Sequence, residues 1–142
     1  MAKHPTVVVP NIGPMDHAWD LLGEWHAEFE PAEGDKVLKA TIVFEDWASG
    51  RADLDPGEAR DAGLPLTIGL ERTSDVHLTE AGGGALQWAL SSPHVEWTVQ
   101  AILWPGALNL FVYDAQDEEQ ELFRARAQRS REYYARKYPG EV

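Results

Sequence analysis

Apolar and polar residues alternate along most of this chain with a period of two residues. The clearest example is the segment 24–30, which follows Gly23. Because successive side chains of a β-strand point to opposite faces, this segment predicts a strand with one dry face and one acidic face. Lining a cavity, the acidic face would form an acid–base cluster, but the period favours a position in solvent. The dry face comprises Trp25, Ala27 and Phe29, and the acidic face comprises Glu24, His26, Glu28 and Glu30.

Turn residues interrupt this alternation and divide the chain into a series of predicted strands. Residues 31–35, PAEGD, and 81–84, AGGG, have the composition of tight turns. Residues 49–63 contain too few apolar residues to pack and predict a polar loop. The strands are expected at 24–30, 37–48, 64–73, 76–79, 85–91, 95–104 and 108–114.

Two segments change to a helical period. Residues 14–22 predict a short N-terminal helix that begins at Pro14, behind a loose arm at 1–13 with a short strand at 7–9. Residues 116–138 predict a C-terminal helix, because the pattern continues without a breaker to Pro139. Residues 122–128 also alternate, so an eighth strand is the alternative there. The helical spacing in 116–138 joins Phe123, Ala127, Tyr134 and Tyr138.

Antiparallel strands at hairpin spacing, with two helices, predict an all-β fold. The size suits a small antiparallel up-and-down barrel or a strongly curved half-barrel. With 142 residues, the chain is expected to form a single domain, 1–142. A small barrel of this kind can enclose one small ligand in its mouth.

Charge and composition limit the classes of partner and cofactor that this chain is expected to bind. The formal net charge is -12 and no basic stripe offsets it, so we expect no nucleic-acid binding. The absence of cysteine excludes disulfides and thiolate chemistry and suits a cytoplasmic location. No run approaches transmembrane length, so we expect no membrane partner. The histidines have no paired ligand spacing and no phosphate-binding loop opens a helix, so we expect no metal and no cofactor.

Two charged residues in register with apolar rows are candidates for catalysis. Arg72 continues the row of Ile68 and Leu70, and Asp46 follows Phe44 on the apolar face of 37–48. Inside the barrel, Arg72 would stabilise a carboxylate, enolate or phenolate, with Asp46 as its partner. At the rim, the same two residues would form only a solvent-exposed salt bridge.

Tyr113 is the third catalytic candidate, and it shares a face with Asn109. If that face points inward, both residues are hydrogen-bond donors in an apolar site. The strand could equally bury Leu108, Leu110 and Val112. The other predicted ligand contacts are aromatic, because flat rings can form a wall for an aromatic ligand; for Trp88 and Trp97 the alternative is plain core packing. The predicted ligand-binding residues are Trp25, Phe29, Phe44, Trp88, Trp97 and Asn109.

Three short motifs resemble known families. Gly23-Glu24-Trp25, after a short helix, resembles the opening of calycin barrels such as lipocalins, fatty-acid-binding proteins and nitrobindins. The run VHLTE at 76–80, followed by a glycine turn and Leu86-Gln87-Trp88, resembles the phenolic acid decarboxylases and the MoaF-like barrels. The run SREYY at 130–134, which closes with Tyr138-Pro139, resembles the later helix of the same group. The resemblance covers the second half of the chain.

The resemblance implies a calycin-like barrel but not the decarboxylase reaction. In the decarboxylases, two tyrosines on the first strand grip the substrate carboxylate, where this chain has Glu28 and Glu30. The family places a glutamate two residues after the hairpin tryptophan, where this chain has Leu90. Two carboxylates repel an anionic substrate, so decarboxylation of phenolic acids is not expected.

The predicted function is that of a small-molecule-binding barrel. The first hypothesis is a cofactor-independent lyase, isomerase or cyclase that acts on an apolar or aromatic molecule through Arg72, Asp46 and Tyr113. The alternative is a non-catalytic carrier or sensor of a lipophilic ligand. A third hypothesis is a barrel with a filled interior that works through an interface. In that case the Phe/Tyr stripe of 116–138, if exposed, would form a homodimer.

Overall fold

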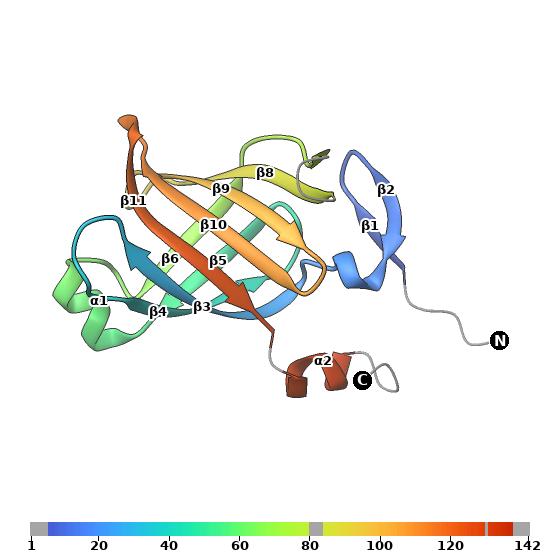
Figure 1. The fold of residues 1–142 in the computed structure, drawn as a ribbon, viewed down its shortest axis with the longest axis horizontal. Helices are drawn as coiled ribbons and strands as arrows, with labels where there is room; N and C mark the ends of the chain where they lie inside the picture. Colours follow the sequence, from blue (N-terminus) through green and yellow to red (C-terminus); the bar gives the residue numbers. More distant parts are fainter. Residues whose placement is uncertain (1–5, 80–83, 130, 138–142) are drawn as a thin grey trace.

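Eight antiparallel strands form a closed barrel (Figure 1). The computed structural model describes residues 6–79, 84–129 and 131–137. β8 closes the barrel by pairing with β6 through Arg72 and Leu90, while β7 (His77–Thr79) pairs with the other part of β8. The order around the barrel is β6 (Thr67–Arg72), β5 (Ser49–Leu54), β4 (Leu38–Phe44), β3 (Gly23–Pro31), β11 (Asp117–Gln128), β10 (Ala107–Asp114), β9 (Trp97–Trp104) and β8 (Ala85–Ser92). This arrangement confirms the all-β antiparallel barrel and is consistent with a calycin-like fold.

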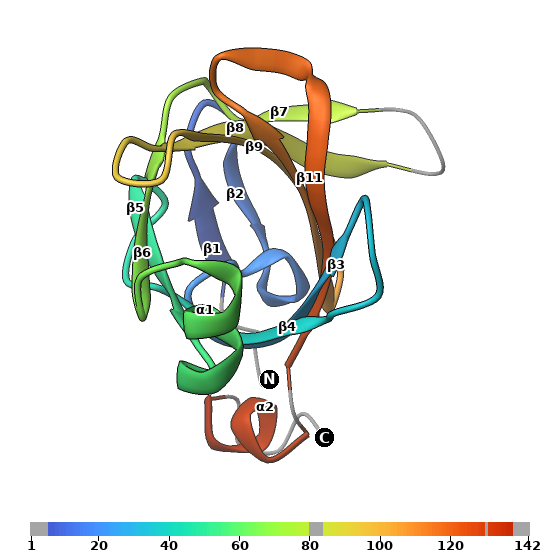
Figure 2. The same cartoon turned by 90° about the vertical axis from the view of Figure 1, so that its left-hand side faces the viewer.

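Different elements surround the two ends of the barrel (Figure 2). We call one end the mouth; it carries helix α1 (Pro56–Ala62) and the β3–β4, β8–β9 and β10–β11 connections. We call the other the closed end; it carries the hairpin of β1 (Thr6–Val9) and β2 (Gly13–Asp16), the 3-10 helix η1 (His17–Trp19) and helix α2 (Arg131–Lys137). Among the described residues, no helix combines the length and apolar character needed to cross a membrane.

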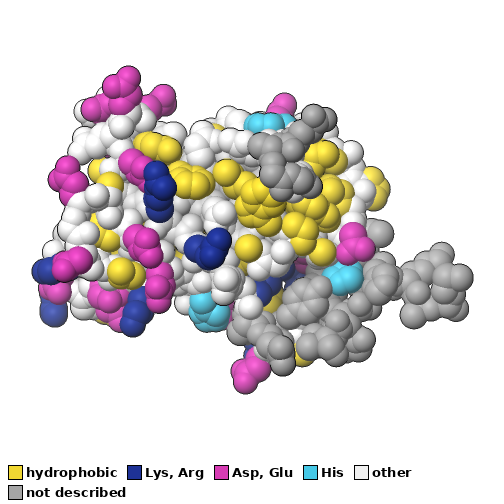
Figure 3. All heavy atoms as spheres, viewed as in Figure 1, with side chains coloured by type: hydrophobic (Ala, Val, Ile, Leu, Met, Phe, Trp, Pro, Cys, Tyr) yellow, Lys and Arg dark blue, Asp and Glu magenta, His cyan; other side chains and the backbone are white. Residues whose placement is uncertain are grey.

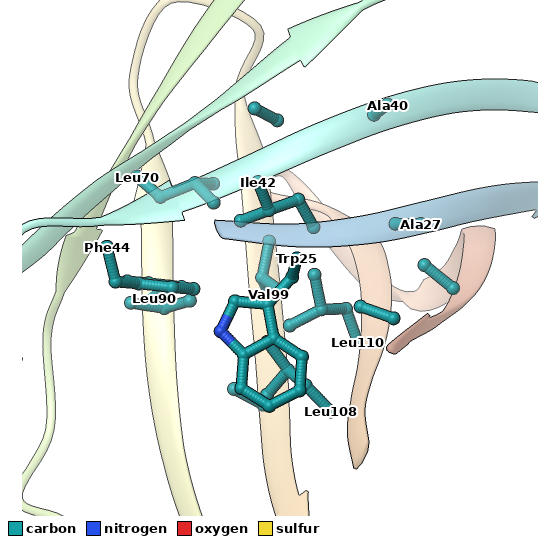
Figure 4. Close-up of a cluster of buried hydrophobic side chains, with 14 of the residues drawn as sticks. Trp25, Ala27, Ala40, Ile42, Phe44, Leu70, Leu90, Val99, Leu108 and Leu110 are labelled. Atoms are coloured by element: carbon teal, nitrogen blue, oxygen red, sulfur yellow. The ribbon is translucent and has the colours of Figure 1, made fainter. Parts of the chain in front are cut away.

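The inward faces of the strands form a packed core (Figure 4). Trp25, Ile42, Trp88 and Leu90 have no exposed surface, so no space large enough for water touches them. Burial of such large apolar side chains contributes about 1.5–3 kcal/mol each. The middle of the barrel is therefore filled by side chains.

Arg129 and α2 fasten the closed end to the chain that enters β3. The Arg129 guanidinium lies 4.1 Å from the centre of the Trp25 ring and donates hydrogen bonds to the carbonyls of Asp20 and Leu22. Lys137 also donates to the Leu22 carbonyl and pairs with the Asp20 carboxylate at 2.6 Å. Since the last strand and helix hold the entry to the first barrel strand, this end of the barrel is locked by contacts distant in sequence.

The N-terminal elements differ from those predicted. The short N-terminal helix is present as η1, but its expected start at Pro14 is wrong, because Pro14 pairs with Val8 in the β1–β2 hairpin. The helix starts after Asp16, whose carboxylate accepts a hydrogen bond from the Ala18 N–H at 3.0 Å. The strand expected at 7–9 is part of β1, so 6–13 is not a loose arm, and residues 1–5 lie outside the described residues.

The polar loop expected at 49–63 is wrong, because this segment forms β5 and α1. β5 turns small residues inward: Ala52 is fully buried, and a Cβ on Gly50 would lie 2.6 Å from the Phe44 ring. Asp55 then caps α1 by accepting a hydrogen bond from the Glu58 N–H at 3.0 Å. Small inward residues and a local cap give little hydrophobic signal, which explains the error.

The C-terminal helix is present, but its expected start at 116 is wrong. Residues Asp117–Gln128 form β11, which pairs with β10 and β3, and α2 begins only at Arg131. Phe123 therefore belongs to the barrel and not to an exposed helical stripe. The homodimer stays a prediction, but Phe123 cannot be part of a helical stripe that forms it. Tyr138 and most of the turn expected at 81–84 lie outside the described residues, although β7 and β8 on either side of the turn are antiparallel.

Candidate functional site at the barrel mouth

Asp46 and Arg72 both contact the turn between β4 and β5 at the closed end, where Asp46 is part of the turn and Arg72 is the last residue of β6. The Asp46 carboxylate accepts hydrogen bonds from the N–H groups of Ala48 and Ser49, both at 2.8 Å. Arg72 donates from Nε to the Trp47 carbonyl at 3.1 Å and from Nη1 to the Ser74 carbonyl at 2.9 Å. Both side chains thus hold backbone groups of turns, and within the described part of the chain no ion pair joins them.

Tyr113 is not brought together with Asp46 and Arg72. β10 buries Leu108, Leu110 and Val112, as the alternative interpretation proposed, so Asn109 and Tyr113 are on the outer face. Tyr113 is the cross-strand partner of Thr98 and Glu121, toward the mouth. The catalytic roles of Asp46, Arg72 and Tyr113 stay predictions, and the structure assigns the two charged residues an additional structural role.

Replacing Asp46 by alanine is expected to lower the free energy of unfolding by about 1 kcal/mol, because two N–H groups of the β4–β5 turn lose their acceptor. Urea unfolding followed by circular dichroism measures the change. Glu45→Ala is the matched control, since Glu45 is an exposed neighbour whose carboxylate meets Arg51 at 3.4 Å and holds no turn N–H group among the described residues. Equal effects of the two substitutions would contradict the assigned role.

The predicted ligand wall divides into two parts. Trp25, Phe44 and Trp88 are in the packed core, where Trp88 meets the ring of Trp47 at 5.4 Å. Phe29 and Trp97 reach the mouth instead.

Phe29, Trp97 and Phe123 form an aromatic trio at the mouth. Their ring centres are 6.2 Å apart for Phe29–Trp97, 6.1 Å for Phe29–Phe123 and 5.7 Å for Trp97–Phe123. Such spacings and tilted orientations are favourable for aromatic pairs. Phe123 is not among the predicted site residues because the pattern of 116–138 predicts a helix; the alternation of 122–128 is the signal that places it on a strand.

A pocket opens beside Phe123, between the β3–β4 connection and α1. Its volume is about 670 Å³, within the range of small-molecule sites. Leu38 and Phe123 contribute apolar surface, and Phe29 lies behind them as the cross-strand partner of Leu38. We call this the mouth pocket; it is lined by Pro31, Glu33, Gly34, Asp35, Lys36, Val37, Leu38, Glu58, Asp61, Ala62 and Phe123.

Helix α1 is a fixed wall of the mouth pocket. Ala59 is fully buried against the barrel, and the Glu58 carboxylate accepts a hydrogen bond from the Lys39 N–H at 2.8 Å. Gly63 ends the helix at φ +70°, and Leu64 then donates its N–H to the Ala59 carbonyl. These contacts hold the outer face of α1 in place, so the pocket is preformed.

The rim of the mouth pocket is acidic. Four carboxylates line it against one cation, Lys36. Figure 3 shows further acidic side chains gathered toward this end of the molecule, where the start of β11 contributes Asp117, Glu118 and Glu119. Like charges raise the free energy of an anionic ligand at the rim, so the site favours a neutral or cationic molecule. The four carboxylates belong to Glu33, Asp35, Glu58 and Asp61.

His26, Glu28 and Glu30 face outward, as their alternation predicted. They line a wide, open hollow of about 1010 Å³ on the outer faces of β3, β4, β5, β10 and β11. Opposite charges are cross-strand neighbours there, with Glu28 between Arg126 and Lys39. Nearby, a side-chain hydrogen bond to Glu121, together with the negative charge of that residue, raises the pKa of Arg124 above its ordinary value. Because its side chains are exposed and alternate in charge, this hollow is a solvated surface of the barrel.

Within residues 6–79, 84–129 and 131–137, no group of three histidine, aspartate or glutamate side chains is arranged to hold a metal ion. Comparisons of this chain with protein-family models, curated proteins and solved structures gave no match.

Proposed function

We propose that this chain is a small-molecule-binding barrel that takes an apolar or aromatic ligand in the mouth pocket. The observation that carries the proposal is the position of the pocket against the aromatic trio. A preformed pocket of ligand size, floored by aromatic and aliphatic side chains, is the usual form of such a site.

The geometry supports carriage or sensing better than catalysis. Arg72 and Asp46 hold a turn at the closed end, while the mouth pocket has apolar walls and a rim of carboxylates. A lyase, isomerase or cyclase is the second candidate, supported by the resemblance to the phenolic acid decarboxylases and MoaF-like barrels. That candidate requires turnover to fall when Arg72→Ala or Tyr113→Phe is introduced.

Nile red, a neutral dye that fluoresces strongly outside water, is expected to bind saturably at one site per chain. Ala62→Trp is expected to weaken binding by about tenfold or more, because the indole fills space between α1 and the β3–β4 connection. Fluorescence titration measures both dissociation constants.

Ala135→Trp is the matched control for this experiment. Ala135 is likewise an exposed alanine on a short helix, but α2 is at the closed end. The proposal predicts binding equal to that of the unmodified protein. If Nile red does not saturate, or if Ala135→Trp and Ala62→Trp weaken it equally, the mouth pocket is not the binding site.

A further inference from the structure

We propose that the Ser92 hydroxyl is the polar anchor of the mouth site, reached by rotation of the Phe123 side chain. This inference rests on the proposed function and narrows the ligand class to a neutral aromatic molecule that carries one hydrogen-bonding group.

Ser92 is a polar residue in an apolar row. β8 turns Trp88, Leu90 and Ser92 inward, and Ser92 is only 1 % exposed. Its hydroxyl oxygen has no hydrogen-bond partner among the described residues. A buried hydroxyl without a partner is destabilising, so the position fits a group that gains its partner from a ligand.

Two aromatic side chains, Phe123 and Trp97, lie between the mouth pocket and Ser92. Ser92 is the cross-strand partner of Trp97, and both are inward. The Trp97 ring meets Phe123, and Phe123 lines the mouth pocket. Phe123 is half-buried, unlike Phe29 and Trp97 behind it, so it is the ring with room to turn. Its rotation would open the pocket toward the Trp97 ring, whose cross-strand partner is Ser92.

The surroundings of this route define the ligand. Two aromatic walls favour a flat ring system, and the hydroxyl can donate to a carbonyl or accept from an alcohol. The acidic rim opposes a carboxylate or phosphate. An aromatic alcohol or ketone of naphthalene size satisfies each condition.

The first experiment compares 2-naphthol with naphthalene, which has the same ring system without the hydroxyl. The unmodified protein is expected to bind 2-naphthol about fivefold to tenfold more tightly, the worth of one buried hydrogen bond. Ser92→Ala should abolish the preference and leave naphthalene binding unchanged. Ser91→Ala, next along the strand on its outer face, should keep it. A preference that survives in Ser92→Ala overturns the proposal.

The second experiment tests the route and uses the absence of cysteine from the chain. The single thiol of Ser92→Cys is expected to react slowly with methyl methanethiosulfonate, a small neutral reagent. Adding Phe123→Ala should accelerate the reaction about tenfold or more, and 2-naphthol should slow it. In Ser91→Cys the thiol should react quickly whether or not Phe123 is present. If the thiol of Ser92→Cys reacts at the same rate with and without Phe123→Ala, Phe123 does not control access to Ser92. Phe123→Leu replaces the alanine substitution if that variant does not fold.

Failure of this inference differs from failure of the proposed function. If naphthalene and 2-naphthol both bind, and Ala62→Trp blocks both, the mouth pocket is the binding site. The Ser92→Ala variant then decides whether Ser92 is the anchor. If neither binds while Nile red still binds and Ala62→Trp weakens it, the Ser92 anchor is rejected and the mouth pocket stands; if Nile red fails as well, the mouth pocket itself is rejected. Ser92→Ala is expected to fold at least as stably as the unmodified protein, because it removes a buried group that has no partner.

Discussion

Replacing Gly23 by alanine is expected to lower the free energy of unfolding by about 3 kcal/mol or more, through backbone strain and overpacking. Gly23 has φ +110°, a conformation that residues with a Cβ rarely adopt. An added Cβ would also lie 1.4 Å from the Tyr133 hydroxyl oxygen, so α2 must move or β3 must shift. Urea unfolding, followed by far-ultraviolet circular dichroism, measures the loss.

A double-mutant cycle with Tyr133→Ala separates the two causes. In that background Gly23→Ala should lose the clash and retain only the strain, so its effect should fall by about half. Gly69→Ala is the matched control: Gly69 is exposed on β6, its φ is not positive, and an added Cβ meets nothing within 4 Å. Additive effects of Gly23→Ala and Tyr133→Ala would show that α2 does not pack on this glycine.

The alternation of apolar and polar residues predicted the barrel where the inward side chains are large. Trp25 and Phe29 on β3, and Ile42 and Phe44 on β4, give a strong contrast with their polar neighbours. It failed where the inward side chains are small. On β5 and β11 they include Gly50, Ala52, Ala125 and Ala127, of which Gly50 and Ala125 are the cross-strand partners of Phe44 and Phe29. Alanine gives little hydrophobic contrast and favours a helix, so 116–138 resembled one.

The site was only partly predictable for a related reason. Phe29 and Trp97 are on inward rows that the sequence reveals, and their place in the aromatic trio follows from the strand period. The mouth pocket, by contrast, depends on α1 meeting the β3–β4 connection, a contact between polar segments that carry no period. Similarly, the partnerless state of Ser92 depends on what surrounds it in three dimensions. Periodicity identifies the face of a strand but not the neighbours beyond the strand.

Replacing Arg129 by alanine is expected to lower the free energy of unfolding by about 3–4 kcal/mol, because one side chain makes two kinds of buried contact. The guanidinium stacks on Trp25, which is fully buried, and also donates hydrogen bonds to the carbonyls of Asp20 and Leu22. Its loss leaves the Asp20 carbonyl without this donor and removes the cover of the indole. Urea unfolding measures the stability, and near-ultraviolet circular dichroism reports the change around Trp25.

Two variants show whether the effect belongs to these contacts. Arg129→Lys keeps the charge but loses the planar fork, so its stability should fall between those of the unmodified protein and Arg129→Ala. Arg124→Ala removes an arginine from β11, the strand that Arg129 follows; its main contact is an exposed ion pair with Glu121, so the unfolding midpoint should be nearly unchanged. An Arg129→Ala variant as stable as Arg124→Ala would mean that the closed end does not depend on the arginine. In that case β3 would be held mainly by the Trp25 Nε1 hydrogen bond to the Leu21 carbonyl, at 2.8 Å, and by strand pairing.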